Sequence, residues 1–215
     1  MIDLHTHSLL SDGELLPSEL VRRAEVIGYR AIAITDHSDA SNIDFVIERI
    51  VNVCNELKAA IPVIPGVELT HIPPRQIGQM VKKARELGAR LVLVHGETVV
   101  EPVSPGTNRA AIEAGVDILA HPGLLTPEDA MLAAEKGVCL ELTARKGHSL
   151  SNGHVASVAK KIGVNIVLNT DTHSPSDLIS DDMAVRIVVG AGLTEGDFRE
   201  ITKNAEKILQ RVLRK

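Results

Sequence analysis

The sequence predicts a parallel α/β fold closed into a barrel of seven strands, each followed by a helix. Short, nearly continuous apolar runs rich in β-branched residues alternate with longer segments of helical spacing along all 215 residues, which is typical of βα units. Polar residues suited to catalysis or metal binding follow these runs directly. Because the carboxyl ends of parallel strands meet on one face, such residues would form a single site. A closed sheet brings seven strand ends closer together than an open one, and this favours a barrel.

The predicted strands have continuous rather than alternating hydrophobicity, which indicates burial on both faces of the sheet. They comprise residues 2–4, 31–35, 63–69, 91–94, 118–120, 138–142 and 166–168. The helices predicted after them begin at Pro17 and then span residues 43–60, 76–87, 107–114, 128–136, 154–162, 182–191 and 194–213. Pro17 suits a first helical turn, and Thr126 is suited to cap the helix that follows it. Glycines such as Gly137 and Gly163 follow the last periodic residue, where helices commonly end.

The composition is that of an ordinary globular chain, with 44% hydrophobic and 24% charged residues. Disordered and low-complexity classes are therefore excluded. Only three aromatic residues are present, namely Tyr29, Phe45 and Phe198, so the core must be aliphatic. No linker or change of composition divides the chain, and we expect a single domain over residues 1–215.

Charge and cysteine content limit the classes of partner. The formal net charge of −5 and the absence of a basic run disfavour a surface for nucleic acid. Cys54 and Cys139 lie inside apolar runs, so we expect small core residues and a reducing cytoplasm. The N-terminus does not resemble a signal peptide, and no apolar run is long enough to span a membrane. The sequence gives no indication of the oligomeric state.

Six of the nine histidines stand at the carboxyl ends of predicted strands, together with acidic residues. These candidate metal ligands are His5, His7, Asp12, His37, Glu68, His95, His121, Asp171 and His173. Packed imidazoles and carboxylates are costly to desolvate unless they hold divalent cations. We therefore expect two or three ions, with a carboxylate such as Glu68 bridging two of them. Nitrogen and oxygen ligands without thiolate favour Zn, Mn or Fe over Ca or Mg alone.

Other residues near the strand ends allow a plainer interpretation. Ser11-Asp12-Gly13 is either a simple turn or a source of a ligand. Glu97 either orients a ligand or faces solvent, and the remaining histidines, His71, His148 and His154, are predicted to lie at the surface or behind the ligands. Arg145 and Lys146 follow the sixth predicted strand, which supplies no obvious ligand. They are candidate substrate-binding residues, because a guanidinium can grip a phosphate oxygen bidentately, or else part of a solvated loop.

These motifs resemble those of the PHP domain, the polymerase and histidinol phosphatase superfamily. The matching segments are His5-Thr6-His7-Ser8, Thr35-Asp36-His37, Gly66-Val67-Glu68, His95-Gly96, Ala120-His121-Pro122-Gly123 and Asp171-Thr172-His173. The resemblance implies a distorted barrel of seven parallel strands. It also implies up to three metal ions, held by His5, His7, Glu68 and Asp171, by Glu68, His95 and His121, and by Asp12, His37 and His173. In character the chain is similar to small stand-alone histidinol-phosphatase-like members, although it is shorter than the typical enzyme.

The expected chemistry is hydrolysis of a small phosphomonoester. Three divalent ions would outweigh the charges of Asp12, Glu68 and Asp171 and attract a phosphate dianion to an acidic protein. A metal-activated hydroxide would attack phosphorus, while Arg145 and the third ion hold the other phosphoryl oxygens. Asp12, His37 and Arg145 are the candidate catalytic residues, and a coordinated water or protonated Asp12 would supply the proton for the leaving group.

Two alternatives from other classes remain at the level of sequence. One is a PHP-type nuclease acting on short oligonucleotides or nucleotides, which the scarcity of aromatic stacking platforms disfavours. The other is a non-catalytic scaffold like the similar barrel of ribonuclease P, which the acidic charge and the retained ligand residues disfavour. Neither the physiological substrate nor the metal follows from the sequence.

Overall fold

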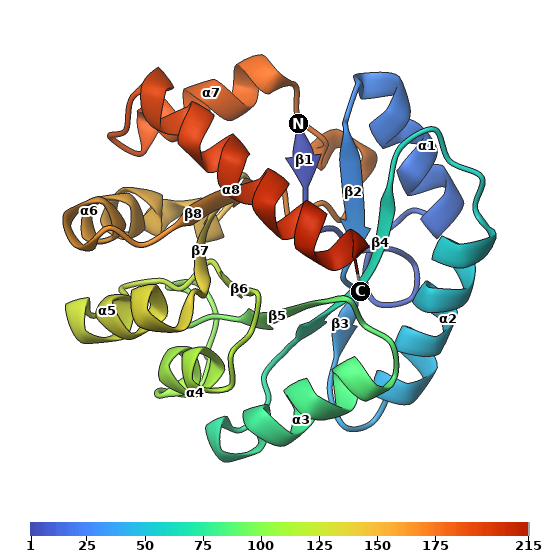
Figure 1. The fold of residues 1–215 in the computed structure, drawn as a ribbon, viewed down its shortest axis with the longest axis horizontal. Coiled ribbons are helices and arrows are strands. Elements are labelled where there is room, and N and C mark those ends of the chain that lie inside the picture. Colours follow the sequence, from blue (N-terminus) through green and yellow to red (C-terminus); the bar gives the residue numbers. More distant parts are fainter. Residues whose placement is uncertain (215) are drawn as a thin grey trace.

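The computed structural model describes residues 1–214. All paired strands run parallel, and the order across the sheet is β1-β2-β4-β5-β6-β7-β8, with the short β3 beside β4. The strands are β1 (Ile2–Asp3), β2 (Ala31–Ile34), β3 (His37–Ser38), β4 (Val63–Leu69), β5 (Leu91–His95), β6 (Ile118–Ala120), β7 (Cys139–Thr143) and β8 (Ile166–Asn169). Figure 1 shows the strands arranged around a centre with most of the helices outside them. The predicted path of seven strands is thus confirmed. The short strand β3 consists of two polar residues, and the sequence analysis did not predict it because it contains no apolar run.

The sheet closes through the segments that follow β1 and β8 rather than through the strands themselves. Thr6 and Thr172 form a parallel bridge. The backbone N–H of His7 donates to the Thr172 carbonyl at 2.8 Å, and that of Asp171 donates to the His5 carbonyl at 2.9 Å. The predicted distorted barrel is therefore confirmed. Its closure falls at the segments that carry candidate ligands.

The helices follow the strands as predicted. They are α1 (Pro17–Ile27), α2 (Ile43–Glu56), α3 (Pro74–Glu86), α4 (Thr107–Glu113), α5 (Pro127–Lys136), α6 (Asn152–Ile162), α7 (Asp181–Gly190) and α8 (Glu195–Leu213), with short 3-10 turns η1 (His148–Ser151) and η2 (Pro175–Asp177). Thr126 caps α5 as expected, since its hydroxyl accepts from the Asp129 N–H at 3.1 Å. The prediction that α2 continues to residue 60 is wrong, because Leu57 turns to extended backbone so that the chain can return to β4.

Two aliphatic layers hold the barrel together. The interior layer consists of small and branched side chains from the strands, among them Ala33, Leu93 and Val167. The outer layer packs the helices against the strands. The aliphatic core expected from the scarcity of aromatic residues is therefore present.

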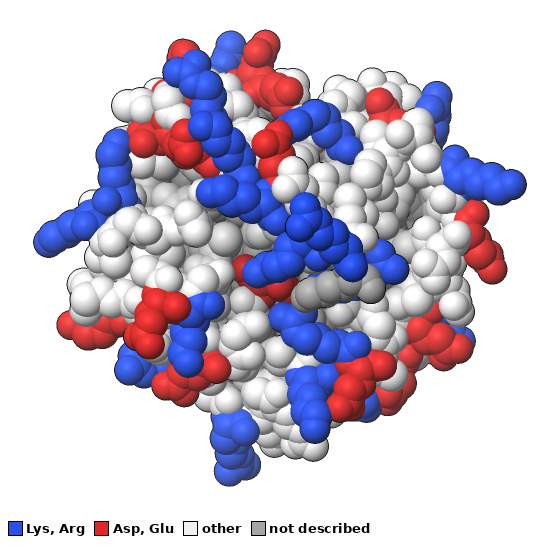
Figure 2. Space-filling view, viewed as in Figure 1, with Lys and Arg blue, Asp and Glu red and all other residues white. Residues whose placement is uncertain are grey.

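Helix α8 crosses the amino-terminal end of the barrel (Figure 1). Ile208 and Val212 of this helix pack into the interior layer, and Arg211 pairs with the buried Asp117 at 2.7 Å. Figure 2 shows lysine and arginine side chains along α8, with acidic side chains around them. This end of the barrel is thereby sealed by an amphipathic helix.

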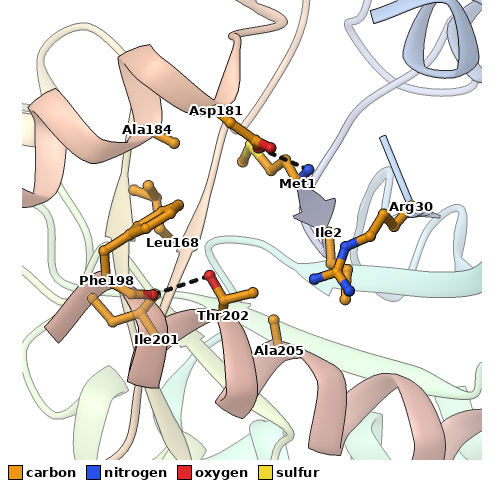
Figure 3. A pocket seen from close by; sticks show the side chains of 10 residues that line it. All are labelled: Met1, Ile2, Arg30, Leu168, Asp181, Ala184, Phe198, Ile201, Thr202 and Ala205. Carbon is orange, nitrogen blue, oxygen red and sulfur yellow. Dashed lines mark hydrogen bonds and ion pairs between the residues drawn. The ribbon is translucent and has the colours of Figure 1, made fainter. Parts of the chain in front are cut away.

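A small cavity of about 100 Å³ lies beside α8 and the start of the chain. There the N-terminal ammonium of Met1 pairs with Asp181 at 2.8 Å, near Phe198 (Figure 3). The contact anchors the first strand against α7. Among the described residues, no helix is long and apolar enough to cross a lipid bilayer.

Candidate metal centre

The candidate ligands predicted from the sequence converge at the carboxyl ends of the strands. His5 and His7 follow β1, Glu68 lies in β4, His95 ends β5 and His121 follows β6. These five residues are buried, as is Asp171 after β8. His37 in β3 and His173 after β8 are partly exposed, and Asp12 lies at the rim with its side chain 58% exposed. The structure therefore brings all nine side chains to one end of the barrel, opposite α8.

Glu68 lies at the centre of this group. One carboxylate oxygen, Oε1, is 3.4 Å from Nε2 of His5 and 3.4 Å from Nε2 of His121. The other, Oε2, is 3.7 Å from Nε2 of His7 and 2.7 Å from Nδ1 of His37. A carboxylate surrounded by four imidazoles is well placed to bridge two cations, as the sequence predicted.

Several buried polar atoms of the group have no hydrogen-bond partner of good geometry among the described residues. They are Nε2 of His5, both ring nitrogens of His7, both carboxylate oxygens of Glu68, Oδ1 of Asp171, and Nδ1 of His95 and of His121. Buried polar atoms are almost always paired, because an unpaired one costs about 1–3 kcal/mol. So many orphaned donors and acceptors facing one another fit divalent cations, for which neutral imidazole and carboxylate are usual ligands.

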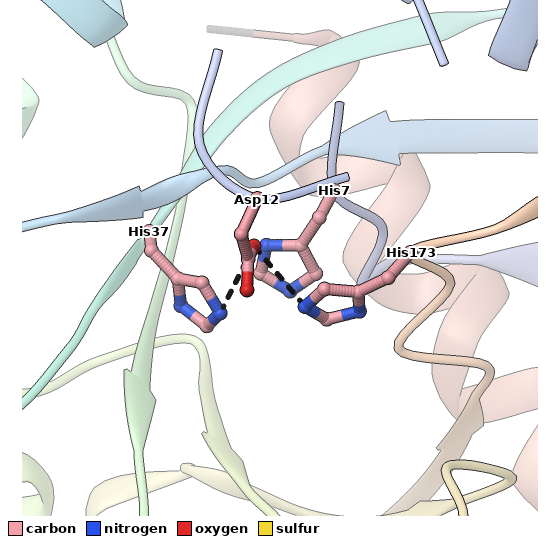
Figure 4. A group of neighbouring side chains, drawn as sticks. All are labelled: His7, Asp12, His37 and His173. Atoms are coloured by element: carbon pink, nitrogen blue, oxygen red, sulfur yellow. Dashed lines mark ion pairs between the residues drawn. The ribbon is translucent and has the colours of Figure 1, made fainter. Parts of the chain in front are cut away.

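The ligand atoms fall into four overlapping groups whose members lie within 4.8 Å of one another. They are His7 with Asp12, His37 and His173; His95 with His121 and His148; His5 with His121 and Asp171; and His5 with His7 and Glu68. Figure 4 shows the first group, in which Asp12 reaches from its loop toward His37 and His173. The groups differ from the sets expected from the family resemblance. His7 joins the rim group, and His148 takes the place of Glu68 beside His95 and His121. The expected first set is divided between two groups, one of which includes His121.

Asp12 is positioned by a loop that Asp36 holds. The Asp36 carboxylate accepts from the backbone and hydroxyl of Ser8, at 2.8 and 2.7 Å, and from the hydroxyl of Ser11 at 2.6 Å. Asp36 thus serves the motif as a structural anchor, while its neighbour His37 faces the site. The Asp12 carboxylate lies 3.2 Å from Nε2 of His173 and 3.6 Å from Nε2 of His37.

Glu141 in β7 is a residue of the site that the sequence analysis missed. It is fully buried, and its Oε1 accepts from Nδ1 of His5 at 2.9 Å and from the Asn169 side chain at 2.7 Å. Its Oε2 accepts from the backbone N–H of His121 at 3.0 Å. A carboxylate that receives the outer N–H of an imidazole fixes the tautomer and orientation that metal binding requires. An acidic residue inside an otherwise apolar strand was the signal that could have revealed it.

The charges of the cluster oppose one another. Burial disfavours ionisation of Glu68, but the imidazoles of His5 and His37 outweigh burial and hold its pKa well below the usual value. Burial likewise disfavours a charged His5, yet Glu141 and Glu68 raise its pKa well above the usual value. Burial, with His37 and His5 nearby, lowers the pKa of His7 well below the usual value. Cations entering the site therefore compete with protons at His5, whereas His7 is available as a neutral ligand.

The lowered pKa of Asp12 does not favour its predicted role as a proton donor. Burial alone would raise this pKa, but the His173 and His37 imidazoles outweigh it. The carboxyl group is therefore ionised at neutral pH and is suited to accept or ligate rather than to donate.

Five of the nine side chains, Asp12, His37, His95, Asp171 and His173, line a cavity of about 250 Å³. Arg145 lines it and is held by Asp177, whose carboxylate lies 3.2 Å from the guanidinium. Lys146, the other predicted substrate-binding residue, is exposed and does not line the cavity. Of the three histidines expected at the surface or behind the ligands, His71 and His148 both line the cavity, whereas His154 pairs with the Leu125 carbonyl elsewhere.

His148 and Glu101 complete one wall of the cavity. His148 is buried, and burial together with the nearby His121 lowers its pKa to about 3, so the imidazole is neutral. Glu101 lies on the loop between β5 and α4, where contact with His95 outweighs burial and lowers its pKa to about 2. The sequence analysis missed Glu101, because it follows no strand directly.

Close approach of two loops fixes the position of this wall. A Cβ atom on Gly123 would lie 1.8 Å from the Glu97 carbonyl oxygen, so only glycine fits there. Glu97, whose role the sequence left open, accepts with its Oε1 from the N–H groups of Gly106 and Asn108, at 3.0 and 2.9 Å. It therefore ties together the base of the loop that carries Glu101. His121 and Asp171 adopt left-handed backbone, with φ of 25° and 54°, as strained residues at functional sites often do.

The model of the PHP domain matches residues 3–138. This chain belongs to the PHP-domain family. An uncharacterized protein of Methanocaldococcus jannaschii is 51% identical over 98% of this chain and 99% of its own length. Ribonuclease P protein component 3 of Methanosarcina barkeri is 30% identical over 93% of this chain and 85% of its own length. A probable phosphatase of Shewanella sp. (strain ANA-3) is 30% identical over 87% of this chain and 82% of its own length.

Solved structures share the fold of this PHP domain. A chain of archaeal ribonuclease P with mature tRNA superposes with a TM-score of 0.71 at 21% identity, covering 97% of this chain and 90% of that one. Histidinol phosphate phosphatase of Lactococcus lactis, in complex with zinc, L-histidinol and phosphate, gives a TM-score of 0.59 at 19% identity over 89% of this chain and 94% of that one. The barrel is thus the same in proteins of different activity, and function must be argued from the site.

Proposed function

We propose that this protein is a metal-dependent phosphoesterase that hydrolyses small phosphomonoesters at a centre of two or three divalent cations. The observation that carries the proposal is the set of buried nitrogen and oxygen atoms without hydrogen-bond partners that lie 3.2–3.8 Å from one another, contributed by His5, His7, Glu68 and Asp171. Membership of the PHP-domain family and the 30% identity to a probable phosphatase support the same reaction class.

The residues divide into three candidate sets. His5, His7, Glu68 and Asp171 would hold one ion, and Glu68 with His95 and His121 a second. The rim residues Asp12, His37 and His173 would hold a third, with His7 close enough to contribute. Zinc, manganese and iron all suit these nitrogen and oxygen ligands. Bound there, the cations would supply Lewis acidity, lowering the pKa of a coordinated water toward about 7 and offsetting the phosphoryl charge.

The protein's own groups then bind and orient the substrate. Arg145 would donate a hydrogen bond to a phosphoryl oxygen, and Asp177 fixes the guanidinium so that less rotamer freedom is lost on binding. The leaving group would lie toward the mouth, where Asp12 and His37 are partly exposed. The cavity of about 250 Å³ favours a small substrate over a polymer.

The test is turnover by metal-stripped protein supplied separately with zinc, manganese or iron. A panel of phosphomonoesters and phosphodiesters identifies the reaction class, and we expect release of phosphate from monoesters. His37→Ala and His121→Ala should lose most of this turnover, while His154→Ala, outside the cavity, should keep it. Absence of phosphate release with every metal would contradict the proposal.

A second candidate is a role in RNA processing, favoured by the identity to ribonuclease P protein component 3. The same panel distinguishes it, provided that it includes single-stranded RNA and precursor tRNA. Cleavage of diesters in preference to monoesters would indicate a nuclease. Binding of RNA without hydrolysis of any ester would indicate a scaffold.

A further inference from the structure

Beyond the nine candidate ligands, one wall of the cavity holds a second set of metal-binding groups. We propose that His148 and Glu101 are additional ligands of the ion assigned to His95 and His121, so that three imidazoles and two carboxylates, Glu101 and Glu68, surround it. The inference deepens the proposed function, and it rests on that function only for what the ion does.

The first observation is the position of the His148 ring. A ligand atom of His148 lies within 4.8 Å of those of His95 and His121, and all three residues are buried. The rings of His121 and His148 stack with centroids 4.2 Å apart and planes inclined by 15°. Nε2 of His95 and Nε2 of His121 face the carboxylates of the site, at 3.2 Å from Glu101 and 3.4 Å from Glu68. Three buried imidazoles this close together suit a shared cation.

The second observation is that the ring of His148 is fixed from behind. Its Nδ1 lies 2.7 Å from the hydroxyl of Thr98, which is itself buried. In the tautomer that carries its proton on Nδ1, the ring donates to this hydroxyl and the Nε2 lone pair is left free on the side of the cavity. An outer hydrogen bond that selects one tautomer is the usual arrangement behind a metal-ligating histidine.

The third observation is the Glu101 carboxylate, which lies among three imidazoles. Its Oε2 is 3.2 Å from Nε2 of His95 and 3.4 Å from Nε2 of His71, and its Oε1 is 3.4 Å from Nε2 of His148. Glu101 thus joins His95 at the end of β5 to His148 in η1. His95, His121 and His148 with Glu101 would give the four ligands usual for zinc, and Glu68 would be a fifth.

Glu101 differs from the ligands at the strand ends in its attachment. It projects from a loop of residues 97–106 that Glu97 ties at its base, rather than from the end of a strand. Its side chain is 38% exposed at the mouth of the cavity. Ligation by Glu101 would therefore couple the position of this loop to the occupancy of the metal site that includes His95 and His121.

The experiment measures metal binding without any substrate. Metal-stripped wild type is titrated with Co²⁺, whose visible absorption reports coordination, and bound ions are counted by atomic emission after gel filtration. The variants are His148→Gln, Glu101→Gln and Thr98→Val. The matched controls are His154→Gln and Glu135→Gln, which lie outside the cavity.

Loss of an outer hydrogen-bond partner lowers metal affinity roughly 10–100-fold. We expect His148→Gln and Glu101→Gln to lower the affinity for one Co²⁺ ion by more than this and to change the absorption spectrum of that ion. Thr98→Val should lower the affinity for the same ion by an amount within that range, and both controls should bind Co²⁺ as wild type does. A loss in His148→Gln and Glu101→Gln no larger than that in Thr98→Val overturns direct ligation. Should His148→Gln fail to fold, the more exposed Glu101→Gln still decides the question. A wild type that binds the ion through these residues but releases no phosphate refutes the proposed function alone.

Discussion

Replacing Glu141 by glutamine tests whether the buried carboxylate behind His5 organises the metal centre. Glu141 receives three donors: the His5 ring and the Asn169 amide at Oε1, and the His121 backbone N–H at Oε2. A glutamine of the same shape has one acceptor oxygen and one NH₂ group. Whichever way its amide is turned, at least one buried donor then faces another donor.

The magnitude follows from this count. One buried donor without an acceptor costs about 1–3 kcal/mol of folding free energy. If the NH₂ group of the glutamine faces His5, the imidazole also loses the acceptor that fixes its tautomer. The affinity for the ion that His5 would hold should then fall roughly 10–100-fold, about 1.4–2.7 kcal/mol. Both effects arise without the loss of any direct ligand.

The assay combines urea unfolding of the metal-stripped protein with competition for zinc against a chromophoric chelator. Glu135→Gln on the exposed face of α5 is the matched control and should behave as wild type. We expect Glu141→Gln to have a lower urea midpoint and a weaker zinc affinity. If both quantities equal those of wild type, the assignment of Glu141 as the organising carboxylate is refuted.

Three further predictions concern the cavity, the last helix and the metal. Arg145→Met should raise KM for a phosphomonoester about 10-fold, because one hydrogen bond to a charged group is lost, whereas Lys146→Met should leave KM unchanged; equal effects in steady-state kinetics would contradict the difference in their positions. Asp197→Asn removes the negative charge that pairs with Lys160 at the N-terminus of α8, and this should cost about 1 kcal/mol at pH 7. Hydrogen bonds from Lys160 and Thr194 lower the pKa of Asp197 to about 2, so this stabilisation is present above pH 4 and is lost as pH falls toward 2; a difference in urea midpoint that persists unchanged at the lowest pH would refute the linkage. Chelation should lower Tm, and zinc at about 1,000 times its Kd should restore roughly 4 kcal/mol per ion, whereas a Tm indifferent to chelator would argue against bound cations in the folded state.

The local pattern of the sequence predicted most of the barrel because its elements are encoded locally. Continuous apolar runs mark strands that are buried on both faces, and capping residues such as Thr126 mark helix ends. The polar strand β3 and the early end of α2 escaped prediction, since pairing with β4 and the return of the chain to the sheet decide both. Residues at strand ends were found for the same reason, because the parallel topology brings those ends together.

What the sequence by itself determined was the set of imidazoles and carboxylates at the strand ends, with the fold class that gathers them. Only the tertiary structure decided which of them share a site: it added His148 and Glu101 to one wall and Glu141 behind His5, and it left Lys146 outside the cavity. The physical reason is that a metal ligand must have the right residue type, a side chain whose ligand atom points into the site, and the right degree of burial. Those are set by segments far apart in the chain, such as the loop of Glu101 and η1, which meet where Thr98 contacts His148.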